Sequence, residues 1–235
     1  MKRIIEAFKE KWPYYSLELL VITFGILLAF GLNATYQNWN EDRKVYKFES
    51  ELLAELRNSI VYDYSSIENV LDGNLESKSS GQIILNHFDE SLPYHDSLNY
   101  HFWKANHWWQ LNLRHTAFEK TKTYGLNFIK DDSLRMLLSA TYENDAKWWD
   151  DVDNRLALYQ YSVVEPYILN LFESTNLGSD MNPHNYELLR LDQKYRTILK
   201  TNIGNREWFE NIVEHRFLRR LKELDRRLLK EIKSR

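Results

Sequence analysis

Apolar residues follow two patterns along this chain, and each pattern predicts a different kind of helix. Near the N-terminus, Leu17 is followed by the almost unbroken apolar run ELLVITFGILLAFGL, which ends at Leu32. After residue 44, apolar residues instead recur every three or four positions, as in helices that bury one face and expose the other. The first pattern predicts one membrane-spanning helix, and the second predicts an all-α body.

The length and the flanks of the apolar run suit a membrane span. About 20 helical residues cross a hydrocarbon core about 30 Å thick, and aromatic rings favour the headgroup level. The flanking aromatic residues are Trp12, Tyr14, Tyr15, Tyr36 and Trp39. We therefore expect a short cytoplasmic lead at residues 1–13, a transmembrane helix at residues 14–37 and an extramembrane helical domain at residues 38–235.

The charges around the run indicate its orientation. Four basic residues precede it and three follow it closely: Lys2, Arg3, Lys9 and Lys11, then Arg43, Lys44 and Lys47. This slight bias favours an N-terminus in the cytoplasm. A cleaved signal peptide is the alternative, because Ala29-Phe30-Gly31 offers small residues at a cleavage position. Glu18 interrupts the apolar stretch and the helical pattern continues past Trp39, which favours an uncleaved anchor.

One stripe of the predicted span carries small and polar residues. It consists of Glu18, Ile22, Gly25, Ala29 and Asn33, which recur at helical intervals. Gly25 and Ala29 have the small-xxx-small spacing that lets another backbone approach closely, and Glu18 or Asn33 can hydrogen-bond across such a contact. The stripe is therefore a candidate membrane docking face. The alternative is that Glu18 lies at the headgroup boundary and that Gly25 is incidental.

The body is predicted to begin with a long amphipathic helix. Its apolar face is Val45, Phe48, Leu52, Leu56, Ile60, Tyr64, Ile67 and Leu71. No Pro or Gly interrupts residues 37–72, so the anchor and this helix are expected to be continuous up to Gly73, with a break at residues 38–40 as the alternative. A second helix is expected at residues 74–88. A loop at residues 89–96 follows, with Asp96 as N-cap of the next segment.

Further helices are expected in the second half of the chain. Asp131 or Asp132 is a candidate N-cap for a long helix that Pro166 kinks or ends. The residues expected along one side of this helix, most of them apolar, are Leu134, Leu138, Thr141, Asp145, Trp148, Val152, Leu156, Tyr159 and Val163. A loop at residues 174–185 precedes a helix at 186–203 that Gly204 closes. The last helix carries Phe209, Val213, Phe217, Leu221, Leu224, Leu228 and Ile232. We expect it to pack antiparallel to the first body helix as a coiled coil.

Composition agrees with this fold class and narrows the chemistry. Only 7 Gly and 4 Pro occur in 235 residues, which favours long helices. The absence of cysteine excludes disulfides, thiol catalysis and thiolate zinc sites. A net charge of −3 gives no general attraction to nucleic acid.

Candidate binding residues concentrate in the aromatic segment at residues 97–113. Trp103, His107, Trp108 and Trp109 are candidate ligand-lining residues, although aromatic residues also fill cores between helices. Metal binding is not expected, because His101 and His107 lie about 240° apart on a helix, and His115 with Glu119 is an isolated pair. The acidic residues Glu143, Asp145, Asp150, Asp151 and Asp153 are predicted to form a solvated face.

Two segments resemble a known family. The run ELLVITFGILLAFGLNATYQNWNEDRK resembles the start of domain of unknown function family 6090, an uncharacterised family of bacterial single-span proteins. The matching residues are Glu18, Gly25, Ile26, Leu27, Ala29, Asn38, Trp39, Asn40 and Glu41, and farther on Gly125, Leu134, Arg135 and Tyr142. The junction at residues 31–34 departs from the Gln-rich junction of the family. The resemblance implies an N-terminal anchor and a helical body, and it implies no activity.

These observations favour a membrane-anchored interaction or sensory module without catalytic activity or cofactor. The expected location is the bacterial inner membrane, with the body in the periplasm. The expected partners are the lipid bilayer and either a second copy of the chain or another membrane protein, but not nucleic acid. Two alternatives remain open. Glu18 could act as a titrating carboxylate in an ion-coupled membrane assembly, and the Trp-rich segment could form a ligand-binding or hydrolytic domain.

Overall fold

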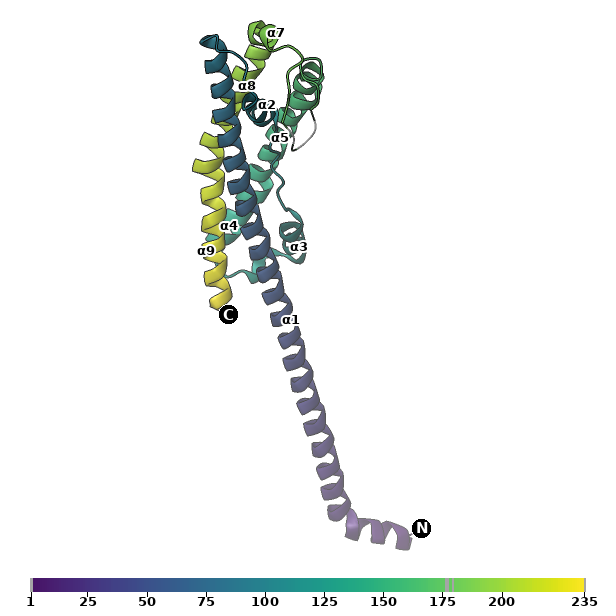
Figure 1. The fold of residues 1–235 in the computed structure, drawn as a ribbon. Helices are drawn as coiled ribbons and strands as arrows, with labels where there is room; N and C mark the ends of the chain where they lie inside the picture. The colour runs from purple at the N-terminus through teal and green to yellow at the C-terminus, as the bar shows by residue number, and fades with distance from the viewer. Residues whose placement is uncertain (1, 176–177, 179, 235) are drawn as a thin grey trace. The chain divides into compact units, whose positions relative to one another are not determined.

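The computed structural model describes the chain except for residues 1, 176–177, 179 and 235. Its described residues are mostly helical and contain no β-strand, so the all-α class is confirmed (Figure 1). An isolated antiparallel bridge joins Phe172 to Pro183. The helices are α1 (Lys2–Asp89), α2 (Leu98–Asn106), α3 (Thr116–Tyr124), the 3₁₀ turn η1 (Leu126–Phe128), α4 (Asp132–Ser139), the π-helix η2 (Ala140–Ala146), α5 (Lys147–Tyr159), the π-helix η3 (Gln160–Val164), α6 (Glu165–Ile168), α7 (Tyr186–Leu191), α8 (Gln193–Ile212), the π-helix η4 (Val213–Leu218) and α9 (Arg219–Lys233).

The chain divides into two compact units, residues 1–51 and 52–235. The first unit consists of the N-terminal part of α1, and its described side chains are exposed from Ser16 to Phe48. Val45 and Phe48, which were predicted to lie on the buried face of the body, belong to this unit and are exposed. The predicted domain boundary after residue 37 depends on where a membrane would end, and it stays a prediction.

Helix α1 corrects the prediction that Gly73 ends a helix. The helix passes through residues 38–40 and through Gly73 without a break and ends at Asp89, so the separate helix at residues 74–88 does not exist. A Cβ added to Gly73 would lie 2.5 Å from Cδ2 of Trp109. Glycine is therefore present because an indole ring packs against the helix backbone. One glycine in a helix interior costs only about 1 kcal/mol, which this packing offsets.

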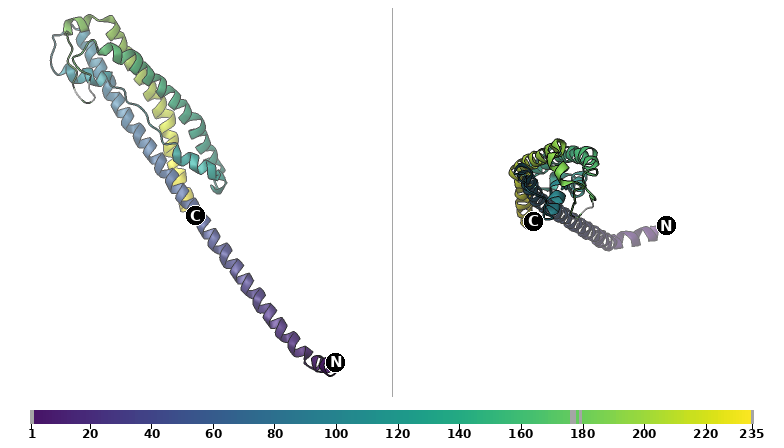
Figure 2. Two further views of the ribbon diagram at one scale, coloured as in Figure 1. Left: turned by 90° about the vertical axis from the view of Figure 1, so that its right-hand side faces the viewer. Right: turned by 45° about the horizontal axis from the view of Figure 1, so that its top comes forward.

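The second unit has a core between α1 and the C-terminal helices. Three ion pairs fix their relative direction: Arg57 with Asp225 at 2.7 Å, Glu68 with Lys222 at 2.6 Å, and Lys78 with Glu210. Residue numbers rise along α1 while they fall along the partner helices, so the predicted antiparallel packing is confirmed (Figures 1 and 2). A coiled-coil geometry stays a prediction. The core of this region includes Leu53, Leu56, Ile60, Ile67, Phe209, Val213, Phe217, Leu221, Leu224 and Leu228.

The π-helices η2 and η3 shift the faces of the long helix that begins at Asp132. The periodicity predicted burial of Trp148 and Val163, but both are exposed, and their neighbours Trp149 and Val164 are buried. A π-turn adds one residue to a helical turn and rotates all later residues around the axis. Pro166 does not end the helix, which continues to Ile168. The wider π-turn of η3 immediately before it reduces the clash between the proline ring and the preceding turn.

Helix boundaries near residue 200 also differ from the prediction. Gly204 lies inside α8, and no atom lies within 4 Å of the position that its Cβ would occupy. The break occurs at Asp192 instead, where the backbone is extended and the carboxylate accepts a hydrogen bond from the Tyr195 amide at 2.9 Å. An N-cap carboxylate satisfies a free amide at a helix start, so α8 begins at Gln193. The predicted helix at residues 186–203 is therefore two helices, α7 and α8.

The predicted caps and loops gave mixed outcomes. Asp131 is confirmed as the N-cap of α4, because its Oδ1 accepts hydrogen bonds from the amides of Ser133 at 2.9 Å and Leu134 at 3.2 Å. Asp96 is not a cap; Ser97 precedes α2, and its amide donates to His95 Nδ1 at 3.1 Å. In the loop predicted at residues 174–185, the described residues form no helix, while residues 176, 177 and 179 lie outside the described part.

Candidate functional site

The four candidate ligand-lining residues fall into two groups. Trp103, His107 and Trp108 line a cavity of about 310 Å³ in the second unit, together with Asn106 at the end of α2. Trp109 lies outside this cavity. Its ring packs against Gly73, and its Nε1 donates to Ser77 Oγ at 3.2 Å. The predicted ligand-binding segment is thus partly core and partly cavity wall.

Two buried side chains from other helices determine where α2 ends. Gln160 Nε2 donates to the Asn106 carbonyl at 2.8 Å, and Arg206 donates through a guanidinium nitrogen to the His107 carbonyl at 2.7 Å. Arg206 is 1 % exposed, and burial lowers its pKa to about 10. A cation at a helix C-terminus complements the negative end of the helix dipole. These two contacts position the cavity wall that α2 supplies.

The rest of the cavity wall comes from a distant part of the sequence. Tyr161 and Glu165 from η3 and α6 line the cavity with Ile168, and Thr175 and Met181 follow them. The amide of buried Met181 donates to the Asn99 carbonyl at 3.1 Å, which joins this segment to α2. Sequence reasoning missed all five residues. Residues 161, 165 and 168 have the spacing of one helix face, which could have indicated them. The predicted buried side instead ran along the neighbouring face, through Tyr159 and Val163.

Several polar groups of the cavity have no protein partner among the described residues. Trp108 Nε1 and Asn106 Oδ1 are buried and make no hydrogen bond, although Asn106 Nδ2 donates to the Phe102 carbonyl and to Tyr195 Oη. The Glu165 carboxyl group makes no ion pair with a described residue, and burial raises its pKa. The pKa of His107 is lowered, chiefly by burial, which favours a neutral imidazole.

A second group of aromatic rings beside the cavity already holds a cation. Lys104 is buried and forms an ion pair with Glu76. Its Nζ lies 4.9 Å from the ring centroid of Trp103, 5.3 Å from that of Trp109 and 5.7 Å from that of Tyr100. These distances lie within the range of cation–π attraction. Trp103 therefore belongs both to this cation site and to the cavity wall.

The predicted solvated acidic face is wrong for two of its residues. Asp153 is buried, accepts a hydrogen bond from the Leu111 amide at 3.4 Å and has a pKa raised by burial to about 6. Asp145 is also buried, and it pairs with Arg216 at 3.3 Å and with Arg220. Both carboxylates satisfy groups from other segments, which a pattern within one helix does not show. Two other residues of the predicted acidic face form ion pairs: Glu143 with Lys122 at 2.5 Å and Asp150 with His115 at 3.0 Å.

Asp63 on α1 is another carboxylate that binds polar groups of distant segments. It accepts a hydrogen bond from the Arg114 amide at 2.8 Å and from the Tyr142 hydroxyl at 2.9 Å, and its pKa is raised by burial to about 6. Asp63 and Asp153 together hold the extended segment between α2 and α3, whose amides have no strand partner. No group of three or more metal-ligating side chains with suitable geometry occurs among the described residues.

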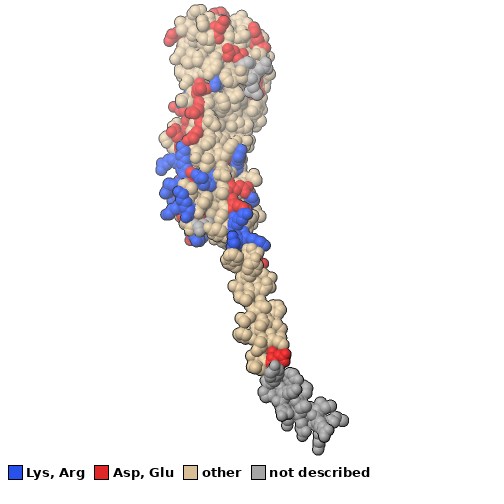
Figure 3. Space-filling view, turned by 60° about the horizontal axis from the view of Figure 1, so that its bottom comes forward, with Lys and Arg blue, Asp and Glu red and all other residues tan. Residues whose placement is uncertain are grey.

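The candidate docking face lies in the first unit. Glu18, Ile22, Gly25, Ala29 and Asn33 are all exposed on α1, and nothing lies within 4 Å of the Cβ position of Gly25. Among the described residues, α1 is the one helix long and apolar enough to cross a membrane. Figure 3 shows this unit with a long uncharged surface, whereas Lys, Arg, Asp and Glu form several patches on the visible face of the second unit. Docking through the stripe stays a prediction.

Comparison with known proteins adds no relative. The chain matches no family model, no curated protein and no solved structure.

Proposed function

We propose that this protein is a membrane-anchored helical module that recognises a ligand or partner without catalysing a reaction. The exposed apolar surface of the first unit carries the proposal. Leu20, Phe24, Leu27 and Phe30 are each at least half exposed, as are most of their neighbours. Soluble proteins rarely expose contiguous apolar patches above a few hundred Å², so a lipid environment is the arrangement that suits this surface.

Extraction from membranes tests the anchor. We expect the full chain to stay in the membrane pellet after alkaline carbonate treatment. Arginines introduced by Phe24→Arg and Leu27→Arg should release it, because each costs about 3 kcal/mol near the bilayer centre. The matched control is Leu158→Arg with Leu169→Arg, which changes two exposed apolar residues of the second unit. Release of the unmodified chain by carbonate contradicts the proposal.

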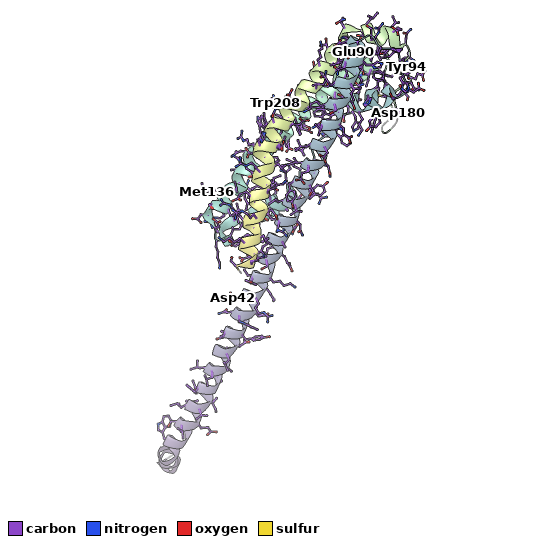
Figure 4. All side chains as sticks on the ribbon, turned by 60° about the vertical axis from the view of Figure 1, so that its left-hand side comes forward. Asp42, Glu90, Tyr94, Met136, Asp180 and Trp208 are labelled. Atoms are coloured by element: carbon purple, nitrogen blue, oxygen red, sulfur yellow. The ribbon has the colours of Figure 1, made fainter. Side chains whose placement is uncertain are left out.

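The absence of cysteine allows a direct test of orientation. We propose that the N-terminus is cytoplasmic and that the second unit lies on the periplasmic side of a bacterial inner membrane. A single cysteine introduced by Glu90→Cys, at an exposed position (Figure 4), should react with a membrane-impermeant maleimide added to spheroplasts. Labelling only after cell lysis contradicts this orientation.

A partner in the membrane is the second part of the proposal. The stripe of Glu18, Gly25 and Ala29 would be the docking face for another copy of the chain or for a different membrane protein. Gly25→Ile with Ala29→Ile should reduce crosslinking in native membranes, because larger side chains prevent close approach of two helices. Gly31→Ile is the matched control on another face. Equal crosslinking of all three proteins contradicts this docking face.

A further inference from the structure

The cavity at the end of α2 is lined by hydrogen-bond acceptors and aromatic rings, and neither Lys nor Arg is among its described lining residues. Among the described residues that line it, Glu165 is the one acidic residue, and Asn106 contributes a buried Oδ1 without a partner. His107 contributes a neutral imidazole. Glu165 itself is exposed, whereas the buried Asn106 Oδ1 is costly without a donor unless a ligand supplies one. Asn106 Oδ1 therefore favours a ligand that donates hydrogen bonds, and the Glu165 carboxylate favours a positive charge on that ligand, although Lys104 and Arg206 lie close enough to act on His107.

The aromatic residues of the cavity favour the same kind of ligand. Trp103, Trp108 and Tyr161 line it beside Glu165, and the faces of such rings attract ammonium groups. The neighbouring Lys104 site shows the same combination with its cation in place, namely three rings and the carboxylate of Glu76. The cavity thus combines aromatic rings with a carboxylate as the Lys104 site does, but no Lys or Arg among the described residues lines it.

Two more features define the rest of the ligand. Trp108 Nε1 is a buried donor without an acceptor, so the ligand needs one acceptor close to its ammonium group. Ile168 and Met181 provide apolar parts of the wall. A cavity of about 310 Å³ is at the small end of the range for ligand sites, which begins near 300 Å³. A single ring or a short aliphatic chain fits this size.

We propose that the cavity binds a small primary amine in its ammonium form, with an apolar body and one neighbouring hydroxyl or carbonyl oxygen. Glu165 and Asn106 Oδ1 accept hydrogen bonds from the ammonium group, and Trp108 Nε1 donates to the oxygen. The inference deepens the proposed recognition function by naming the ligand class, and it does not depend on membrane insertion.

A series of three related probes tests the charge preference. They are 2-amino-1-phenylethanol, the neutral 1-phenylethane-1,2-diol and the anion mandelate, which share the ring and the hydroxyl group. Binding to the full chain in detergent is measured by calorimetry at neutral pH. We expect the amine to bind about 10- to 100-fold more tightly than the diol, as for a hydrogen bond to a charged group. Equal affinities, or no binding of the amine at about 1 mM, overturn the proposal.

Two substitutions assign the preference to individual residues. Glu165→Gln should remove the difference between amine and diol, whereas Glu90→Gln, the same change at an exposed carboxylate outside the cavity, should leave it intact. Trp108→Phe keeps an aromatic ring but removes Nε1, so it should abolish the advantage of 2-amino-1-phenylethanol over 2-phenylethylamine. Trp208→Phe is its control at an exposed tryptophan outside the cavity (Figure 4). Thermal unfolding of each variant confirms that it is folded.

The results separate this inference from the proposed function. An amine preference that Glu165→Gln leaves unchanged contradicts the cavity assignment, whatever the carbonate extraction shows. Conversely, release of the chain from membranes contradicts the anchor and leaves the ligand measurements valid, because they are made in detergent.

Discussion

At the scale of single residues, two glycines in helix interiors have opposite environments. A Cβ at Gly73 would overlap the ring of Trp109, whereas a Cβ at Gly204 would meet no atom within 4 Å. We expect Gly73→Ala to lower the free energy of unfolding by about 1–3 kcal/mol through overpacking. Gly204→Ala should raise it by about 0.5–1 kcal/mol, because alanine loses less backbone entropy in a helix. Urea denaturation of both variants checks this, and a stabilised Gly73→Ala protein contradicts the packing.

The buried carboxylate of Asp63 predicts a pH-dependent contribution to stability. Its pKa is raised from 3.8 to about 6, so the folded protein holds the proton more tightly than the unfolded chain does. As the pH rises from about 4 to 7, ionisation of Asp63 therefore lowers the free energy of unfolding by up to about 3 kcal/mol. Asp63→Asn removes that loss, since the amide does not ionise.

The expected result is a change in relative stability with pH. Between about pH 4 and pH 7, the free energy of unfolding of the Asp63→Asn protein should rise by up to about 3 kcal/mol relative to that of the unmodified protein. The exposed Asp151→Asn substitution is the control. Other groups, such as His101 and His107 with lowered pKa values, contribute equally to both proteins and cancel in the difference. A pH-independent difference between the two proteins contradicts the raised pKa.

At the scale of helices, the π-turn η2 predicts which of two adjacent tryptophans stabilises the fold. Trp149 is 1 % exposed and packs edge to face on Phe209, with ring centroids 5.4 Å apart, whereas Trp148 is 41 % exposed. We expect Trp149→Ala to cost about 3–5 kcal/mol and Trp148→Ala about 1 kcal/mol or less. Denaturant unfolding of both variants measures this. If Trp148→Ala cost more than Trp149→Ala, the result would contradict the π-turn η2 and would indicate a regular α-helical register.

The same helix shows how far sequence reasoning reaches. Apolar periodicity correctly located the buried face of α9 and that of α1 from Leu52 onward, because both helices keep one period along the face that they bury. Beyond η2 it failed at Trp148 and Val163, because the π-turns change the helical register and no residue type marks a π-turn, although Val152 is buried as predicted. It also treated Gly73 and Gly204 as helix ends, although one packs against a ring and the other is merely tolerated.

The candidate cavity was predicted only in part, for a related reason. Trp103, His107 and Trp108 were identifiable because they are close in sequence and aromatic. Tyr161 and Glu165 come from a helix far along the chain, and the register error placed the apolar stripe on a different face. Buried partners such as Arg206 were also missed, because a basic residue in an amphipathic helix normally lies on the solvated side.

At the scale of the whole molecule, the first unit contributes nothing to the two hydrophobic clusters of the described residues. The first cluster begins at Leu53 and the second at Ile84. The ion pairs that connect α1 to α8 and α9 begin at Arg57. Every interaction used above to explain the body, the extended segment and the cavity therefore lies within residues 52–235.

This division predicts that residues 52–235 fold without the anchor. The shortened protein should remain in the supernatant after ultracentrifugation without detergent, unfold cooperatively and keep the amine affinity of the full chain, because both clusters remain complete. A second truncation that begins at Val70 removes Leu53, Leu56, Ile60 and Ile67 from the first cluster. Loss of a single buried leucine or isoleucine side chain costs about 2–5 kcal/mol, and typical domains are stable by only about 5–15 kcal/mol. The shorter protein should therefore aggregate. Aggregation of residues 52–235 as well would show that the first unit is needed for folding and not only for attachment to a membrane.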